Sequence, residues 1–156
     1  MALILYNDIA SYNSQKVRLY FIEMSIKWID TKFDLLKQEH LNEEYLKVNP
    51  NGLVPALVDS EKIICNSSDI MKYVTDTYIN DNHDATELSE QIYIFCKSDE
   101  AIHDPFIRTL SFNFLWMKKT KSSEEIERIL ALASKHPNRA RGAFLKKAVL
   151  GKFTVE

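Results

Sequence analysis

The hydroxyl side chains best placed for chemistry stand at two points where a predicted strand gives way to a predicted helix. Ser11 follows the apolar run at residues 3–6, and Ser67 follows the run at residues 62–65. The first amides of a helix lack partners within the helix, and the helix dipole favours negative charge there. A hydroxyl at such a position can therefore donate a hydrogen bond to a thiolate or a carboxylate. Simple capping of the helix is the alternative role for either serine.

The dipeptide Val54-Pro55 is a third feature, because it directly precedes the short apolar run at residues 56–58. A peptide bond before proline adopts the cis form more readily than other peptide bonds do. In the cis form the backbone of Val54 would face outward, where it could pair with an extended peptide ligand as an added strand does. An ordinary trans proline at a sheet edge is the alternative.

Composition limits the class of protein to which these residues belong. The 156 residues are 46% hydrophobic and 27% charged, which is typical of a globular protein. The formal net charge of −2 does not indicate binding to nucleic acid or to an anionic membrane. Cys65 and Cys96 lack CxxC spacing, so neither a disulfide framework nor a metal site is predicted. Since neither a signal peptide nor a membrane span is indicated, a cytoplasmic protein is expected.

The elements that must position these residues alternate in type along the first half of the chain. Apolar runs predict strands at residues 3–6, 28–33, 56–58 and 62–65. Helical spacing of apolar residues predicts helices over about 12–24, 41–48 and 66–78. The order β-α-β-α-β-β-α indicates an α/β domain over residues 1–79. Open α/β sheets bind ligands at the carboxyl ends of their strands, where the three features fall.

The second half of the chain has only helical patterns. The polar segment 80–84 is expected to be a linker, and residues 85–156 are expected to form a short all-α domain. Pro105 should kink or split a long helix over residues 85–119. Capping residues predict two further helix starts, at Ser122 with Glu125 and at Asn138.

The three features together resemble the cytosolic glutathione transferase superfamily, whose N-terminal half is thioredoxin-like. The matching blocks are Ser11-x-x-Ser14-x-Lys16-Val17-Arg18, Asn49-Pro50-Asn51-Gly52-Leu53-Val54-Pro55-Ala56-Leu57 and Ile64-Cys65-Asn66-Ser67-Ser68-Asp69-Ile70-x-x-Tyr73. The first and third blocks are similar to those of ganglioside-induced differentiation-associated proteins and their bacterial relatives. The resemblance covers residues 1 to about 80. It implies a thioredoxin-like βαβαββα domain followed by a truncated helical glutathione-transferase domain.

The resemblance implies a serine-type glutathione S-transferase with Ser11 as its catalytic residue. Ser11 would hydrogen-bond the sulfur of glutathione and activate the thiol for attack on small hydrophobic electrophiles. Ser14 and, less favoured, Tyr6 are the alternatives for this contact. A hydroxyl donor beside a helix start lowers the pKa of a thiol, which is near 8.5 when unperturbed.

The resemblance also assigns the residues that would hold glutathione, the co-substrate. Val54 would pair with its cysteinyl backbone, beside a cis Pro55, while Asn66 and Ser67 would hold the γ-glutamyl group. His40 resembles a histidine that some classes use against the glycine carboxylate, with Lys37 and Gln38 as nearby alternatives. A homodimer is expected, with no metal, nucleic acid or membrane as partner.

Several departures from the family pattern favour an alternative function, a non-catalytic binding or interaction module. Leu53 replaces a basic or polar residue, Asn66 stands where Glu or Gln is commoner, and Asp69 adds negative charge near the ligand's own carboxylate. The helical half is also much shorter than the family's, which indicates a truncated or a compact protein. Part of its apolar side chains should form a dimer interface: Tyr93, Phe95, Phe106, Phe112, Phe114, Leu115 and Trp116. A second-substrate pocket would be lined by Phe106, Arg108, Phe112 and Trp116.

Overall fold

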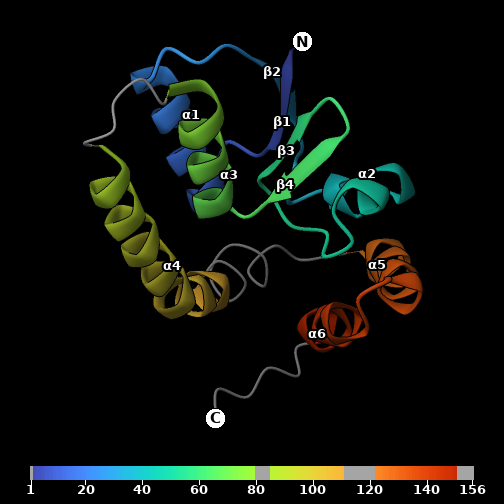
Figure 1. Cartoon of the computed structure of the whole chain (residues 1–156). Coiled ribbons are helices and arrows are strands. Elements are labelled where there is room, and N and C mark those ends of the chain that lie inside the picture. The colour runs from blue at the N-terminus through green and yellow to red at the C-terminus, as the bar shows by residue number, and fades with distance from the viewer. Residues whose placement is uncertain (1, 80–84, 111–121, 151–156) are drawn as a thin grey trace. The chain divides into compact units, whose positions relative to one another are not determined.

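A four-stranded mixed sheet organises the first half of the computed structural model, which describes residues 2–79, 85–110 and 122–150 (Figure 1). The strands are β1 (Leu3–Asn7), β2 (Trp28–Lys32), β3 (Ala56–Asp59) and β4 (Lys62–Cys65). Their spatial order is β2-β1-β3-β4, with β1 parallel to β2 and antiparallel to β3. β3 and β4 form the predicted antiparallel hairpin. This topology confirms the thioredoxin-like domain expected from the sequence.

Helices α1 (Tyr12–Glu23) and α3 (Ser67–Val74) pack against one face of this sheet. Leu5 of β1 is fully buried in the shared core. The other members of that core are Leu3, Val17, Phe21, Leu57, Ile70 and Val74. Because side chains alternate along a strand, the neighbouring Tyr6 lies on the other face, where its ring stacks on Phe33 at 5.9 Å.

The α-helix between β2 and β3 is shorter than the sequence predicted. A 3-10 turn (η1, Glu39–Leu41) and the six-residue α2 (Glu43–Val48) replace the single helix expected over residues 41–48. Asn42 separates the two, because its side chain caps α2 by accepting the Tyr45 amide at 2.7 Å. α3 ends in a π-helical turn, η2 (Thr75–Ile79), within the segment predicted as helix.

The second half contains α4 (Ala85–Leu110), α5 (Ser123–Lys135) and α6 (Arg139–Val149). The predicted capping box of Ser122 and Glu125 opens α5, and Asn138 caps α6. α4 continues through Pro105, so this proline does not split the helix. The expected linker at 80–84 lies outside the described residues.

The chain divides into two compact units. The first comprises Met1–His40 and Leu53–Ala101, and therefore holds the sheet, α1, α3 and most of α4. The second comprises Leu41–Gly52 and Ile102–Glu156 and has its own core around Leu41, Ala133 and Leu145. No helix in the described ranges has the length and apolar character needed to cross a bilayer.

Candidate functional site

The first turn of α3 binds a carboxylate. Ser67 and Ser68 are the first two residues of this helix, and each is only 1% exposed. Oε1 of Glu100, on α4, accepts a hydrogen bond from the Ser67 hydroxyl. The same oxygen accepts the Ser68 amide at 3.1 Å and the Ser68 hydroxyl at 2.8 Å. The Ser68 amide is one of the free backbone groups that a helix start offers to an anion, and the two serine hydroxyls add donors beside it.

Lys16 of α1 supplies a positive charge to the same point. Its Nζ lies 2.9 Å from Glu100 Oε1 and 3.4 Å from the Ser68 hydroxyl. Burial acts to raise the pKa of Glu100, but hydrogen bonds from Ser67, Lys16 and Ser68 outweigh it and hold that pKa below its usual value. Ser67, Ser68 and Lys16 therefore form a seat for an ionised carboxylate, which we call the carboxylate seat.

The start of α1 adjoins this seat. The Ser67 hydroxyl lies 3.3 Å from Oδ1 of Asn13, which is in the first turn of α1. Ser11 is the N-cap residue of α1, and its hydroxyl oxygen accepts the Ser14 amide at 3.3 Å. The structure thus brings the helix start that carries Ser11 beside the helix start that carries Ser67. Ser11 has the capping role, and its own O–H remains a donor for a second group.

The two alternatives to Ser11 occupy different surroundings. Ser14 is fully buried, and its hydroxyl accepts the amide of Asp8 at 3.4 Å. Tyr6 lies on the face of the sheet opposite α1 and α3. Ser11, at the start of α1, is partly exposed, as is Tyr6, whereas Ser14 is buried. Of the three residues, Ser11 is both partly exposed and on the helix start that adjoins α3.

The Val54–Pro55 peptide bond is cis, as the resemblance implied. Pro55 is buried, whereas Val54 and Leu53 are partly exposed. Val54 stands two residues before β3, which pairs directly with β1. The backbone of Val54 therefore leads directly into β3, one of the two central strands of the sheet.

Asn66 holds an unusual backbone conformation at the entrance to α3. Its φ of 75° and ψ of 139° lie in a region that is rare for residues other than glycine. Its side chain does not cap α3 but donates to Asp69 Oδ2 at 3.2 Å. Such strain persists only where the surrounding structure enforces it, and it gathers at binding sites.

Asp69 is paired within the protein. Its carboxylate accepts the Tyr93 hydroxyl at 2.8 Å and lies 3.1 Å from Nζ of Lys97, both on α4. Burial acts to raise its pKa, but the hydrogen bonds from Tyr93, Lys97 and Asn66 hold the pKa of Asp69 below its usual value. Its negative charge is therefore balanced by Lys97 rather than directed at a ligand.

His40 is only 8% exposed in η1, so it is a buried residue rather than a surface histidine. Its alternative Gln38 is 4% exposed and has a positive φ of 63°. The other alternative, Lys37, is well exposed and pairs with Asp34 at 3.2 Å. Of the three candidates for a glycine carboxylate, Lys37 is the most accessible.

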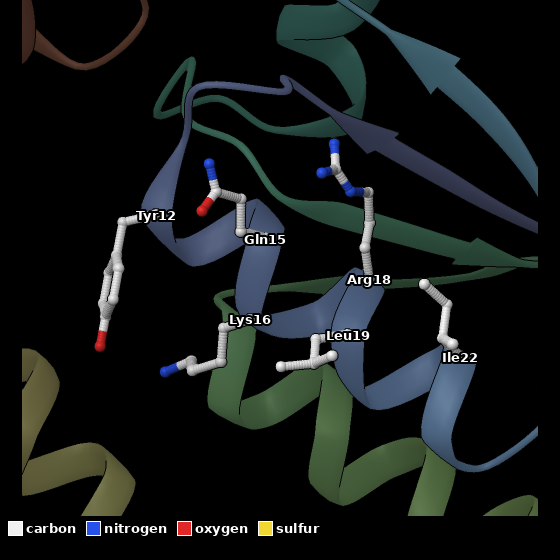
Figure 2. A pocket seen from close by; sticks show the side chains of 6 residues that line it. All are labelled: Tyr12, Gln15, Lys16, Arg18, Leu19 and Ile22. Carbon is white, nitrogen blue, oxygen red and sulfur yellow. The ribbon is translucent and has the colours of Figure 1, made fainter.

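A hollow of about 550 Å³ follows the outer face of α1. Figure 2 shows the six side chains that line it: Tyr12, Gln15, Lys16, Arg18, Leu19 and Ile22. Leu19 and Ile22 are 60% and 62% exposed, so the hollow presents apolar surface beside the basic groups. The side chains of Phe106, Arg108, Phe112 and Trp116, expected to line a second-substrate pocket, lie outside the described side chains.

Sequence reasoning missed Glu100, which is the group that fills the carboxylate seat. A signal for it exists in α4, where Tyr93, Lys97 and Glu100 recur at helical spacing and so share one face. The contacts of Tyr93 with Asp69 and of Glu100 with Ser68 place that face along the first turn of α3. In the parts of the chain that the structure describes, no group of His, Cys, Asp and Glu gathers as metal ligands would.

Residues 5–81 match the family model of the glutathione S-transferase N-terminal domain. Over 77 residues the chain is 40% identical to a zeta-class glutathione S-transferase from Euphorbia esula, covering 47% of this chain and 33% of the relative. Human glutathione S-transferase theta-2 is 31% identical over 83 residues, covering 53% of this chain and 34% of the relative. The matched segment thus spans about a third of the length of these relatives.

Solved structures share the fold over more of the chain. The beta-etherase LigF from Sphingobium superposes with a TM-score of 0.76 at 22% identity, covering 95% of this chain and 63% of LigF. Human glutathione transferase theta-2, solved with glutathione and an unknown ligand, has a TM-score of 0.62 at 22% identity, with coverages of 86% and 58%. A glutathione transferase homologue from Drosophila mojavensis with bound glutathione has a TM-score of 0.63 at 19% identity, with coverages of 97% and 97%.

The strand order of the first unit, the match over residues 5–81 and the superposed structures agree with one another. Through its thioredoxin-like N-terminal domain, the chain belongs to the glutathione S-transferase superfamily.

Proposed function

We propose that this protein binds glutathione across the adjoining starts of α1 and α3 and transfers it to a small hydrophobic electrophile. The carboxylate seat is the observation that carries the proposal. Ser67, Ser68 and Lys16 already hold an ionised carboxylate by donors that suit the α-carboxylate of a γ-glutamyl group. The ligand's cysteinyl part would pair with the backbone of Val54.

Ser11 would act on the sulfur of the bound ligand. Its O–H can donate to a thiolate, and the positive end of the α1 dipole favours the same charge. Both effects lower the pKa of the thiol from about 8.5 and raise the fraction of thiolate at neutral pH. The thiolate then attacks an electrophilic carbon, a C–S bond forms, and the leaving group departs with the electron pair of the bond that breaks.

Calorimetric titration with glutathione near neutral pH tests the binding part of this proposal. We expect saturable binding that Ser67→Ala weakens, because the variant removes one donor of the carboxylate seat. The exposed Ser134, whose hydroxyl bonds only within α5 to the Leu130 carbonyl, offers the matched control Ser134→Ala. A folded protein that shows no heat of binding at millimolar glutathione contradicts the proposal.

The role of Ser11 is tested by the ultraviolet absorbance of the bound thiolate across pH. Ser11→Gly is the suitable variant, since glycine at an N-cap costs only a few tenths of a kcal/mol. We expect it to raise the pKa of the bound thiol towards about 8.5 and to slow conjugation of an activated aryl halide. An unchanged thiol pKa would remove Ser11 from this role.

The alternative function, a non-catalytic binding or interaction module, has one specific observation in its favour. Glu100 fills the carboxylate seat, so the protein satisfies these donors with a group of its own. Binding of glutathione without turnover of any aryl halide or epoxide would support this alternative over the transferase.

A cytoplasmic homodimer completes the proposal. Ile92, Ile94 and Phe95 of α4 are 52%, 59% and 69% exposed, which is apolar surface that a second copy could cover. Of the side chains expected at this interface, Phe106, Phe112, Phe114, Leu115 and Trp116 lie outside the described side chains. Light scattering of the purified chain and of Phe95→Asp tests it: a dimer that the variant dissociates is expected.

A further inference from the structure

The hydrogen bonds at the carboxylate seat converge on one oxygen. Ser67 has one hydroxyl proton, and Ser68 has one amide proton and one hydroxyl proton. All three are directed at Glu100 Oε1, and Nζ of Lys16 lies 2.9 Å from the same atom. The Glu100 side chain is only 12% exposed. A second carboxylate cannot accept these protons while Glu100 accepts them. The negative charge of Glu100 would also repel a second carboxylate beside it.

α4 is tethered where it keeps Glu100 in place. Three residues before Glu100, Lys97 pairs with Asp69 of α3 at 3.1 Å, and the Tyr93 hydroxyl donates to the same carboxylate at 2.8 Å. Tyr93, Lys97 and Glu100 share one face of α4, so these contacts fix that face along the first turn of α3. An internal carboxylate held so close has a high effective concentration at the seat.

We infer that Glu100 is a built-in competitor for the carboxylate seat, so that a ligand's carboxylate enters only after Glu100 has left it. The inference rests on the proposed function for the identity of that ligand, glutathione. Whether a ligand's carboxylate competes with Glu100 for the seat can be tested with acetate alone. In this arrangement Glu100 lowers the affinity for glutathione, and α4 is the element that must yield when the ligand binds.

The test compares the wild type with Glu100→Gln, which keeps the size of the side chain and removes its charge. We expect glutathione to bind about tenfold more tightly to the variant, because a hydrogen bond to a charged acceptor no longer has to be displaced. Glu127→Gln, an exposed position on α5, makes the same charge change at a distance and should leave the affinity unchanged. Unchanged or weaker binding to Glu100→Gln overturns the inference, and weaker binding assigns Glu100 to the ammonium group of the ligand instead.

Acetate separates this inference from the proposed function. The amide resonance of Ser68 should shift on acetate addition at lower concentration in Glu100→Gln than in the wild type, and Ser67→Ala should reverse the gain. If acetate shows this pattern while glutathione binds neither protein, the competitor stands and the transferase proposal fails. If the Ser68 amide responds to acetate equally in both proteins, the competitor is wrong whatever glutathione does.

Discussion

Lys97 and Glu100 lie one turn apart on α4, and both contact the first turn of α3, with opposite charges. Lys97 Nζ is 3.1 Å from Oδ2 of Asp69, while Glu100 Oε1 takes the amide of Ser68 at 3.1 Å. α4 therefore presents a cation to the acidic residue of α3 and an anion to its free amide. This pairing satisfies the start of α3 with groups of the protein itself. It makes α4 part of the site, although the sequence of α4 carries none of the family's matching blocks.

Replacing Lys16 should destabilise the first unit. Lys16 and Glu100 have side chains only 20% and 12% exposed, so Lys16→Met leaves a largely buried carboxylate without its cation. We expect the variant to lose about 2 kcal/mol of unfolding free energy, the range of a hydrogen bond to a charged group. Amide exchange of α3 in the native state measures this loss for the first unit alone.

Lys32→Met is the matched control. Lys32 pairs with Asp30 at 3.1 Å, but the two side chains are 59% and 33% exposed. Exposed ion pairs contribute little, so a change of less than about 0.5 kcal/mol is expected. Equal losses in the two variants would mean that the Lys16–Glu100 pair is no stronger than a surface contact.

Asn66 should prefer glycine to alanine, the reverse of the order at an ordinary position. Both substitutions remove the bond from the Asn66 side chain to Asp69, so they differ only in the Cβ atom. At a φ of 75° and ψ of 139° that atom is strained, by about 1–3 kcal/mol. Glycine in turn lowers the free energy of unfolding by about 0.5–1 kcal/mol, because it has more conformational freedom in the unfolded chain. Asn66→Gly should therefore unfold at a higher urea concentration than Asn66→Ala, and the opposite order would contradict a strained Asn66.

Local signals were enough to predict most of the fold. Two helix starts were predicted from capping residues, one from Ser122 with Glu125 and the other from Asn138. A cap is formed by residues three apart in the sequence, and all three residues have the predicted role. Strands β1 to β4 and helices α1 and α3 followed from the periodicity of apolar residues, which is also a local signal. Pro105 does not divide α4, because a single helix-breaking residue does not outweigh the helical residues around it.

The occupant of the carboxylate seat could not be predicted in this way. Ser67 and Glu100 are 33 residues apart, and their contact depends on how two helix faces meet in space. The sequence reveals that Ser67 starts a helix, and hence that the position favours an anion. It does not reveal that the anion is the protein's own. His40 is buried for a similar reason, since exposure is decided by the chain that covers a residue.

The second unit should lose stability in mild acid through His136. Its side chain is 6% exposed, and burial together with the charge of Arg141 lowers the pKa of His136 below 6.5, against a smaller opposite effect of the Asn138 backbone. The unfolded chain therefore binds a proton more readily than the folded chain. Stability is complete above about pH 6.5 and falls as the pH drops from there towards the folded-state pKa.

Urea unfolding of α5 and α6 at about pH 7.5 and about pH 5.5 measures this slope. His136→Gln removes the titrating group and should flatten it, whereas His103→Gln, at an exposed position on α4, should leave it in place. A slope that survives in His136→Gln assigns the acid sensitivity to another group.

Gly142 should not tolerate a side chain, although it lies inside a helix where alanine is normally favoured. A Cβ at this position would come well within 3.0 Å of the Ala133 carbonyl oxygen, which belongs to the backbone of α5 and cannot rotate away. Gly142→Ala should therefore cost about 2–3 kcal/mol of unfolding free energy, as overpacking does. Ala143 is the neighbouring exposed residue of α6, and there the helix preference should decide, so that Ala143→Gly costs about 1 kcal/mol. If Gly142→Ala instead stabilised α6 by that amount, α5 and α6 would not approach each other at Gly142, and the core around Leu145 would need a different packing.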